Sequence, residues 1–197
     1  MKKPTTPAPA LPIADFPSQS HWTDWLEAHH TSSPGVWLRL SKKGSPTPSV
    51  TYAEAVESAL CYGWIDGQKD SHDDAAWLQK FTPRGPRSIW SKINREKIAS
   101  LTAAGRMRPA GLAAVGRARL GGQWEAAYDP PSTSTVPPDF QAALDESAPA
   151  KAFYATLNSA NRYAILFRIQ NAKKAETRAR KITEFIAMLT RKEKLHP

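Results

Sequence analysis

The chain is poor in cysteine and has no long apolar segment. Its 197 residues contain a single cysteine, Cys61, so no disulfide can form within the chain. That composition fits a reducing compartment. No stretch approaches the roughly 20 consecutive apolar residues of a membrane-spanning helix. We therefore expect no insertion into a membrane and a cytoplasmic location.

The N-terminus lacks the apolar core of a secretory signal. After Met1-Lys2-Lys3 the chain continues with proline, threonine and alanine, without the apolar segment that a signal peptide needs. Proline-rich sequence of this kind buries too little apolar surface to fold. We predict that residues 1–19 form a disordered tail and are not a secretory signal.

Acidic residues are in the minority. The chain has 18 Asp and Glu against 27 Lys and Arg, which gives a formal net charge of +9. The excess is concentrated in residues 80–119 and 151–197, while the remainder of the chain is net acidic. Two basic surfaces on an acidic body suit an anionic partner such as nucleic acid, a nucleotide phosphate or an acidic surface.

Motifs for cofactors, metals and common catalytic machinery are missing. The sequence contains no glycine-rich phosphate loop, no G-x-S-x-G and no dinucleotide-binding fingerprint. The five histidines do not show the spacing of metal ligands. No cofactor and no metal site are therefore expected. Cys61 lies at the C-terminal end of a predicted helix, where a thiol pKa is raised, and is expected to be buried and unreactive.

The apolar pattern predicts an α+β fold for residues 20–129, with a small antiparallel sheet. Thr51 and Glu54 form a capping box that starts one helix, and Pro109 starts another. Alternation and β-branched or aromatic residues predict strands. The predicted strands and helices of this N-terminal domain cover about residues 20–30, 36–40, 51–62, 64–66, 76–81, 88–105 and 109–120.

The C-terminal part is predicted to be a separate, small, all-helical domain. Residues 130–138 are rich in proline, serine and threonine, which is typical of a linker. Beyond them, residues 139–192 carry apolar residues at helical spacing. We expect helices at about 139–146, 148–157, 160–171 and 175–190.

Residues 61–95 have the composition of a ligand site. They hold three of the seven tryptophans together with Arg84, Arg87 and Arg95 around a predicted helix start. Amide groups at a helix start and guanidinium groups bind phosphate or carboxylate. Trp64 could stack on a ligand, and Asp66 could accept a hydrogen bond or act as acid or base. The candidate ligand-binding residues are Trp64, Asp66, Lys69, Arg84, Arg87, Trp90, Asn94 and Arg95.

Purely structural roles are the alternative for the same residues. Trp64 could fill the core and Asp66-Gly67 could form a turn. The arginines could lie on a solvated basic face, or pair with aspartates of residues 70–74. In the C-terminal domain, a basic group could follow a nucleic-acid backbone or be solvated. Its members are Lys173, Lys174, Arg178 and Lys181.

Several separated motifs resemble the bacterial YdeI/OmpD-associated (OmdA) family, also described as bacteriocin-protection proteins. They are Gly63-Trp64-Ile65-Asp66-Gly67, Phe81-Thr82-Pro83-Arg84, Trp90-Ser91-Lys92-Ile93-Asn94, Val136-Pro137-Pro138-Asp139-Phe140, and the segment 172–182. The resemblance covers about residues 20–190. The chain departs from it at Ala175, where the family has a proline.

The resemblance implies tolerance of bacteriocins or cationic peptides and an association with a porin, but no catalytic mechanism. Together with the residues above, it favours a cytoplasmic protein that binds a small anionic ligand in a stress or antimicrobial-tolerance setting. One alternative is an enzyme for a small anionic substrate, with Asp66 as acid or base. Another is a nucleic-acid-binding protein. The sequence does not indicate an oligomeric state.

Overall fold

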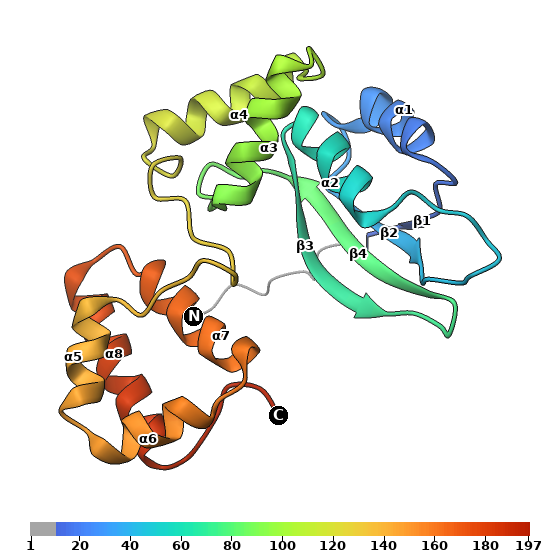
Figure 1. The fold of residues 1–197 in the computed structure, drawn as a ribbon. Coiled ribbons are helices and arrows are strands. Elements are labelled where there is room, and N and C mark those ends of the chain that lie inside the picture. The colour runs from blue at the N-terminus through green and yellow to red at the C-terminus, as the bar shows by residue number, and fades with distance from the viewer. Residues whose placement is uncertain (1–10) are drawn as a thin grey trace, which may run out of the picture. The chain divides into compact units, whose positions relative to one another are not determined.

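The computed structural model describes residues 11–197 and divides them into two compact units (Figure 1). Within this part of the chain, the first unit comprises residues 11–88 and 94–125, and the second comprises residues 89–93 and 126–197. The fold is mixed α/β, and residues 11–197 contain eight helices and one four-stranded sheet. Within the same residues, no helix has the length and apolar character required to span a membrane.

The sheet of the first unit is mixed, whereas an antiparallel sheet was predicted. Its order is β1 (Ile13–Ala14), β2 (Val36–Ser41), β4 (Ala76–Pro83) and β3 (Trp64–Ser71). β4 is antiparallel to both β2 and β3, but β1 pairs parallel with β2. β1 lies in the stretch 1–19 that was predicted to be disordered. Residues 1–10 of that stretch lie outside the described residues.

Four helices accompany the sheet, α1 (Gln19–His29), α2 (Tyr52–Cys61), α3 (Lys92–Ala103) and α4 (Pro109–Leu120). The capping box of α2 is confirmed, because the Thr51 side chain accepts from the Glu54 amide and the Glu54 carboxylate accepts from the Thr51 amide. The α4 backbone approaches α2 closely at Gly111. A Cβ at that position would meet the Cys61 carbonyl oxygen at 2.2 Å, so only glycine fits.

The core of the first unit forms between the helices and one face of the sheet. Trp22 of α1 is fully buried, and its Nε1 donates to the carbonyl oxygen of Ala55 in α2 at 3.1 Å. Its ring packs against Phe81 of β4, with 5.6 Å between ring centroids. Large aromatic groups carry much of the burial that stabilises a domain of this size.

The second unit is built from four helices, α5 (Pro138–Asp145), α6 (Ala148–Thr156), α7 (Ser159–Gln170) and α8 (Ala175–Thr190). Its core includes Phe140, Ile165, Ile169 and Leu189, all fully buried. Residues 130–138, predicted as a linker, belong to this unit. Val136 packs against the core, and α5 already begins at Pro138.

An ion pair between Arg178 and Asp139, called the clamp below, joins α8 to α5. The Arg178 Nε and Nη2 donate to the two oxygens of Asp139 at 2.6 and 2.8 Å, and Nη1 donates to the Ile169 carbonyl at 2.9 Å. The hydrogen bonds from Arg178 lower the pKa of Asp139. Paired, planar geometry of this kind is the strong form of an ion pair.

Replacing Asp139 with asparagine should destabilise the second unit. Asp139→Asn keeps the size and loses the charge, and we expect a loss of about 1 kcal/mol at neutral pH, because the pair is partly solvent-screened. The lowered pKa means that the carboxylate stabilises the fold above the ordinary aspartate pKa of about 4. This contribution disappears as the pH falls through the folded-state pKa. Urea unfolding at neutral and acidic pH measures both effects.

Glu184→Gln is the matched control. Glu184 pairs with Arg180 at 3.7 Å on the exposed surface of α8, so its loss should change the free energy of unfolding little. Equal losses for the two variants, or a difference that persists at acidic pH, would contradict the clamp.

Candidate functional site

The end of the sheet in the first unit holds a cleft of about 610 Å³ with a basic lining. It is bounded by the end of β2 and by the hairpin that connects β3 and β4. The residues that line it are Ser41, Lys42, Lys43, Lys69, Asp70, Ser71 and Trp77. Three ammonium groups therefore surround one tryptophan and one carboxylate.

Strand register places Lys69, Ser71 and Trp77 on one face of the sheet. Trp77 of β4 pairs with Leu40 of β2 and with Ser71 of β3, and Lys69 pairs with Gln79. Directly opposed residues and residues two apart in a strand point to the same face. A bulge between Asp66 and Lys69 shifts the register of β3 before it reaches the cleft. The bulge thereby sets which side chains of β3 reach Trp77.

Trp77 is half-buried, and its ring has one charged and one aromatic neighbour. The Lys69 Nζ lies 4.5 Å from the centroid of its ring, and the Tyr52 ring lies 5.9 Å away. The Tyr52 hydroxyl donates to Asp66 Oδ2 at 2.7 Å. Tyr52 is the first residue of α2, so the capping box that starts this helix also places the aromatic neighbour of Trp77.

The lysines on the other side of the cleft belong to the loop after β2. The Lys42 Nζ donates to the carbonyl oxygen of Asp73, and its amide donates to the carbonyl oxygen of Ala75, each at 2.8 Å. Asp73 in turn organises the β3–β4 turn by accepting from the amides of Ala75 and Ala76. The loop and the hairpin are thus tied together.

Hydrogen bonds keep the Asp73 carboxylate of this turn ionised. Desolvation alone would raise the pKa of Asp73, but the hydrogen bonds from the two amides and from Arg39 outweigh it and lower the pKa. Asp73 therefore stays ionised and keeps the turn closed. The cleft itself has one carboxylate, Asp70, whose Oδ1 accepts from the Ser71 amide at 2.8 Å.

In chemical terms, the cleft offers a flat apolar ring beside exposed cations. Lys42, Lys43 and Lys69 are exposed, and the ion pairs in residues 11–197 do not include any of them. An indole face suits a planar ring, and ammonium groups suit phosphate oxygens. The arrangement fits a ligand that combines a planar group with negative charge.

Two of the predicted site residues, Asp66 and Lys69, lie in this aromatic cluster. Trp64 does not. It is 1 % exposed, its Nε1 donates to the His30 carbonyl at 3.1 Å, and its ring meets those of α1 at the core. Arg84 is 6 % exposed, and its amide donates to the Gly63 carbonyl at 3.0 Å. Both side chains are buried.

The other four predicted residues differ in their exposure and contacts. Arg87 is exposed, and Asn94 is half-buried at the start of α3. Arg95 donates to the Trp124 carbonyl at 2.9 Å and lies 5.2 Å from the centre of that ring. Trp90 is buried and belongs to the second unit. Its carbonyl oxygen accepts a hydrogen bond from the Tyr128 amide of the same unit. Of the eight predicted residues, Lys69 lines the basic cleft, and Asp66 contacts it through Tyr52.

The basic group of the second unit is divided in the same way. Lys173 and Lys174 are exposed, and Lys181 is half-buried. Arg178 forms the clamp with Asp139, so its guanidinium is occupied by protein groups. Three of the four predicted cations remain available for an external anion.

Cys61 is buried, as expected, and burial raises the pKa of its thiol. Its environment does not favour the thiolate that a nucleophile requires. Within residues 11–197, His, Cys, Asp and Glu side chains do not gather in groups of three that could hold a metal ion.

Comparison with protein families gives a different result for each part of the chain. Residues 14–114, just over half of the chain, match the family model described as Domain of unknown function (DUF8412). The chain belongs to this family. Residues 133–192 match a second model, described as Bacteriocin-protection, YdeI or OmpD-Associated. A search of curated proteins and a search of solved structures each found no match.

The OmdA resemblance expected over residues 20–190 is thus shown for the C-terminal part alone. The clamp gives the motifs of that part a physical meaning. Asp139, from the segment that opens the match, and Arg178, from its closing helical motif, are the two partners of the ion pair. The DUF8412 match includes every residue that lines the basic cleft.

The sequence did not predict four residues of the candidate cleft and its surroundings, which are Trp77, Tyr52, Lys42 and Lys43. A partial signal was present, because Lys42-Lys43-Gly44 is a basic turn after a predicted strand. Trp77 lies in the same tryptophan-rich stretch as Trp64. Their proximity depends on the pairing of β2 with β4, which the sequence pattern does not specify.

Arg84→Ala should destabilise the first unit, because the side chain is buried and its removal leaves a cavity. We expect a loss of about 1–3 kcal/mol, which a thermal melt detects as a lower midpoint. Arg87→Ala, an exposed arginine of the same loop, should stay within about 0.5 kcal/mol. Identical melting midpoints for the two variants would show that Arg84 has no structural role.

Proposed function

We propose that the first unit binds a phosphate-bearing ligand with a planar ring, of the nucleotide class, in the cleft around Trp77. The observation that carries this proposal is the position of three exposed lysines around a half-buried tryptophan. The ring of the ligand stacks on Trp77 and its phosphate oxygens contact the ammonium groups. The proposed site differs from the arginine-rich loop predicted from the sequence, and Lys69 is the candidate residue that lines it.

The Lys69 ammonium over Trp77 is a weak competitor for the ring. A cation–π contact at an exposed site contributes about 0.5–1 kcal/mol. Stacking of a base on an aromatic side chain contributes about 1–3 kcal/mol. A ligand ring therefore displaces the ammonium from the ring face, and the flexible Lys69 side chain turns to the phosphate. One residue serves first as a cover for the ring and then as a phosphate contact.

The charges of the cleft favour an anion even with Asp70 present. Lys42, Lys43 and Lys69 outnumber the single carboxylate, and Lys43 has no carboxylate partner among residues 11–197. The Tyr52–Asp66 hydrogen bond keeps the aromatic neighbour of Trp77 in place. We assign Asp66 this positioning role and not that of an acid or base.

The family description of the C-terminal part supplies the setting. We propose that ligand binding serves a stress response that includes tolerance of bacteriocins, because residues 133–192 match a family described by bacteriocin protection. We further propose a cytoplasmic location, where a buried free thiol such as Cys61 remains reduced.

ATP should bind to the wild-type chain more tightly than inorganic tripolyphosphate does, because only ATP has a ring to stack. Trp77→Ala should weaken ATP binding by about 1–3 kcal/mol and leave tripolyphosphate unaffected. Lys69→Ala should weaken both ligands by about 1 kcal/mol or more. Isothermal titration calorimetry measures these affinities at low and moderate salt.

The opposite face of the sheet provides matched controls. Lys80 lies over the ring of Trp37 at 5.9 Å, and strand alternation places this pair on the face away from Trp77. Trp37→Ala and Lys80→Ala should leave ATP binding unchanged, with melting midpoints recorded for all four variants. If the control variants lose as much affinity as the cleft variants, or if ATP does not bind, the proposed function is wrong.

An oligothymidylate serves as a further titrant, because single-stranded nucleic acid repeats the same ring and phosphate chemistry. An affinity for the oligonucleotide that is much higher than the affinity for ATP, and that falls steeply with salt, would indicate a nucleic-acid ligand. Comparable affinities would indicate a free nucleotide. Lys173→Ala tests whether the basic group of the second unit contributes to the oligonucleotide affinity.

A further inference from the structure

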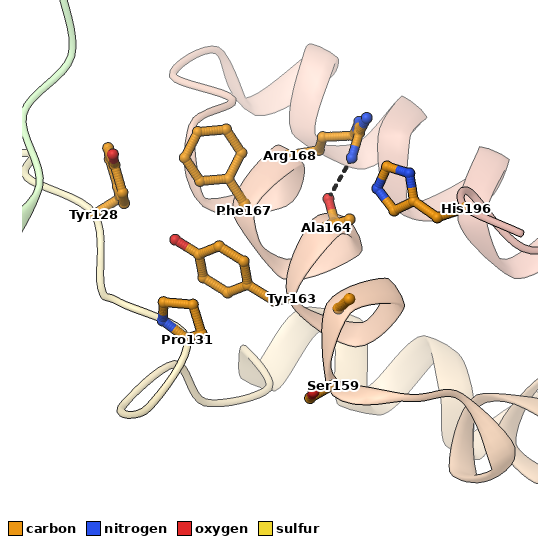
Figure 2. A pocket seen from close by; sticks show the side chains of 9 residues that line it. Tyr128, Pro131, Ser159, Tyr163, Ala164, Phe167, Arg168 and His196 are labelled. Carbon is orange, nitrogen blue, oxygen red and sulfur yellow. Dashed lines mark hydrogen bonds between the residues drawn. The ribbon is translucent and has the colours of Figure 1, made fainter. Parts of the chain in front are cut away.

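The second unit contains a separate pocket of about 710 Å³ on the surface of α7 (Figure 2). Ala160, Tyr163, Ala164, Phe167 and Arg168 of α7 line it at the spacing of one helical face. A different face of the same helix, with Ile165 and Ile169, packs in the core. The helix is therefore apolar on two faces, of which the core buries one.

Contacts within the second unit hold the aromatic wall of this pocket in place. The Tyr128 ring meets Phe167 edge-on, with 4.8 Å between centroids, and the Tyr163 hydroxyl donates to the Asp129 carbonyl at 3.0 Å. Asp129 is itself fixed by hydrogen bonds with Gln170 and by an ion pair with Lys92. Burial, as the main cause, raises the pKa of Tyr163 to about 12. The wall is preformed.

The other end of the pocket is cationic. Figure 2 shows the Arg168 guanidinium beside the His196 ring, opposite Tyr128 and Pro131. Arg168 Nη1 donates to the Ala164 carbonyl at 2.9 Å, and the ion pairs in residues 11–197 do not include Arg168. His196 is held through its backbone by Asn161, a buried side chain that contacts both its amide and its carbonyl.

We infer that this pocket binds a small aromatic carboxylate. The volume lies in the range of small-molecule sites. The aromatic rings of Tyr128, Tyr163 and Phe167 receive the ring of the ligand edge-on or offset, as aromatic pairs prefer. The carboxylate meets the Arg168 guanidinium, which has donors left over from its single backbone contact, and His196 adds a ring nitrogen. The inference does not depend on the cleft of the first unit.

The probe for this site is 2-naphthoate, and its uncharged analogue is 2-naphthalenemethanol. The acid should bind to the full chain about tenfold or more tightly than the alcohol, because only the acid pairs with Arg168. Arg168→Gln keeps the length of the side chain and removes its charge. It should weaken the acid about ten- to a hundredfold and leave the alcohol unchanged. Isothermal titration calorimetry gives the four affinities.

Two further variants locate the site. Arg162→Gln is the matched control, since Arg162 also lies on α7 and donates to a backbone carbonyl, but does not line this pocket. Ala160→Trp fills the pocket from an exposed position, where a larger side chain does not disturb the core, and should abolish binding of both probes.

The inference is overturned if neither probe binds, if acid and alcohol bind equally, or if Arg168→Gln affects the acid no more than Arg162→Gln does. Retention of acid binding by Ala160→Trp, with an unchanged melting midpoint, would also reject the pocket. ATP titration of Ala160→Trp separates the two proposals, because the cleft around Trp77 is intact in this variant.

Discussion

The first unit depends on the indole of Trp22. This side chain is fully buried, donates to the Ala55 carbonyl of α2, and packs its ring against Trp64 of β3 and Phe81 of β4. One residue of α1 thus fixes a helix against two strands. The position of α2 decides where Tyr52 lies, and Tyr52 is the aromatic neighbour of Trp77. The shape of the cleft is therefore a consequence of core packing several residues away.

Local signals in the sequence predicted most helices and strands, because their causes are local. The Thr51–Glu54 capping box specifies the start of α2 through hydrogen bonds within four residues. Long-range pairing was beyond such signals. The two residues of β1 form a strand only because they pair with β2. Residues 89–93 belong to the second unit through the backbone hydrogen bond between Trp90 and Tyr128. Neither partner can be read from a local pattern.

The candidate site was harder to predict, because tryptophan and arginine serve both cores and ligand sites. Trp64 and Arg84 have the residue types of an anion site but are buried in the first unit. Trp77, from the same stretch, reaches the surface because its strand extends to the end of the sheet. Two of its lysine neighbours, Lys42 and Lys43, come from a turn more than thirty positions earlier, through the Leu40–Trp77 pairing. Composition indicated a region, whereas strand register decides which side chains line the cleft.

The two proposed sites use positive charge in different surroundings. In the cleft, exposed lysines act as solvated point charges, so water and salt screen each contact, and affinity depends on their number and on stacking. In the pocket on α7, the arginine is half-buried in a largely apolar lining, so a single pair is screened less. Arginine is suited to that role because its planar fork matches a carboxylate and loses little hydration. A flexible phosphate chain suits the first arrangement, and a compact carboxylate suits the second.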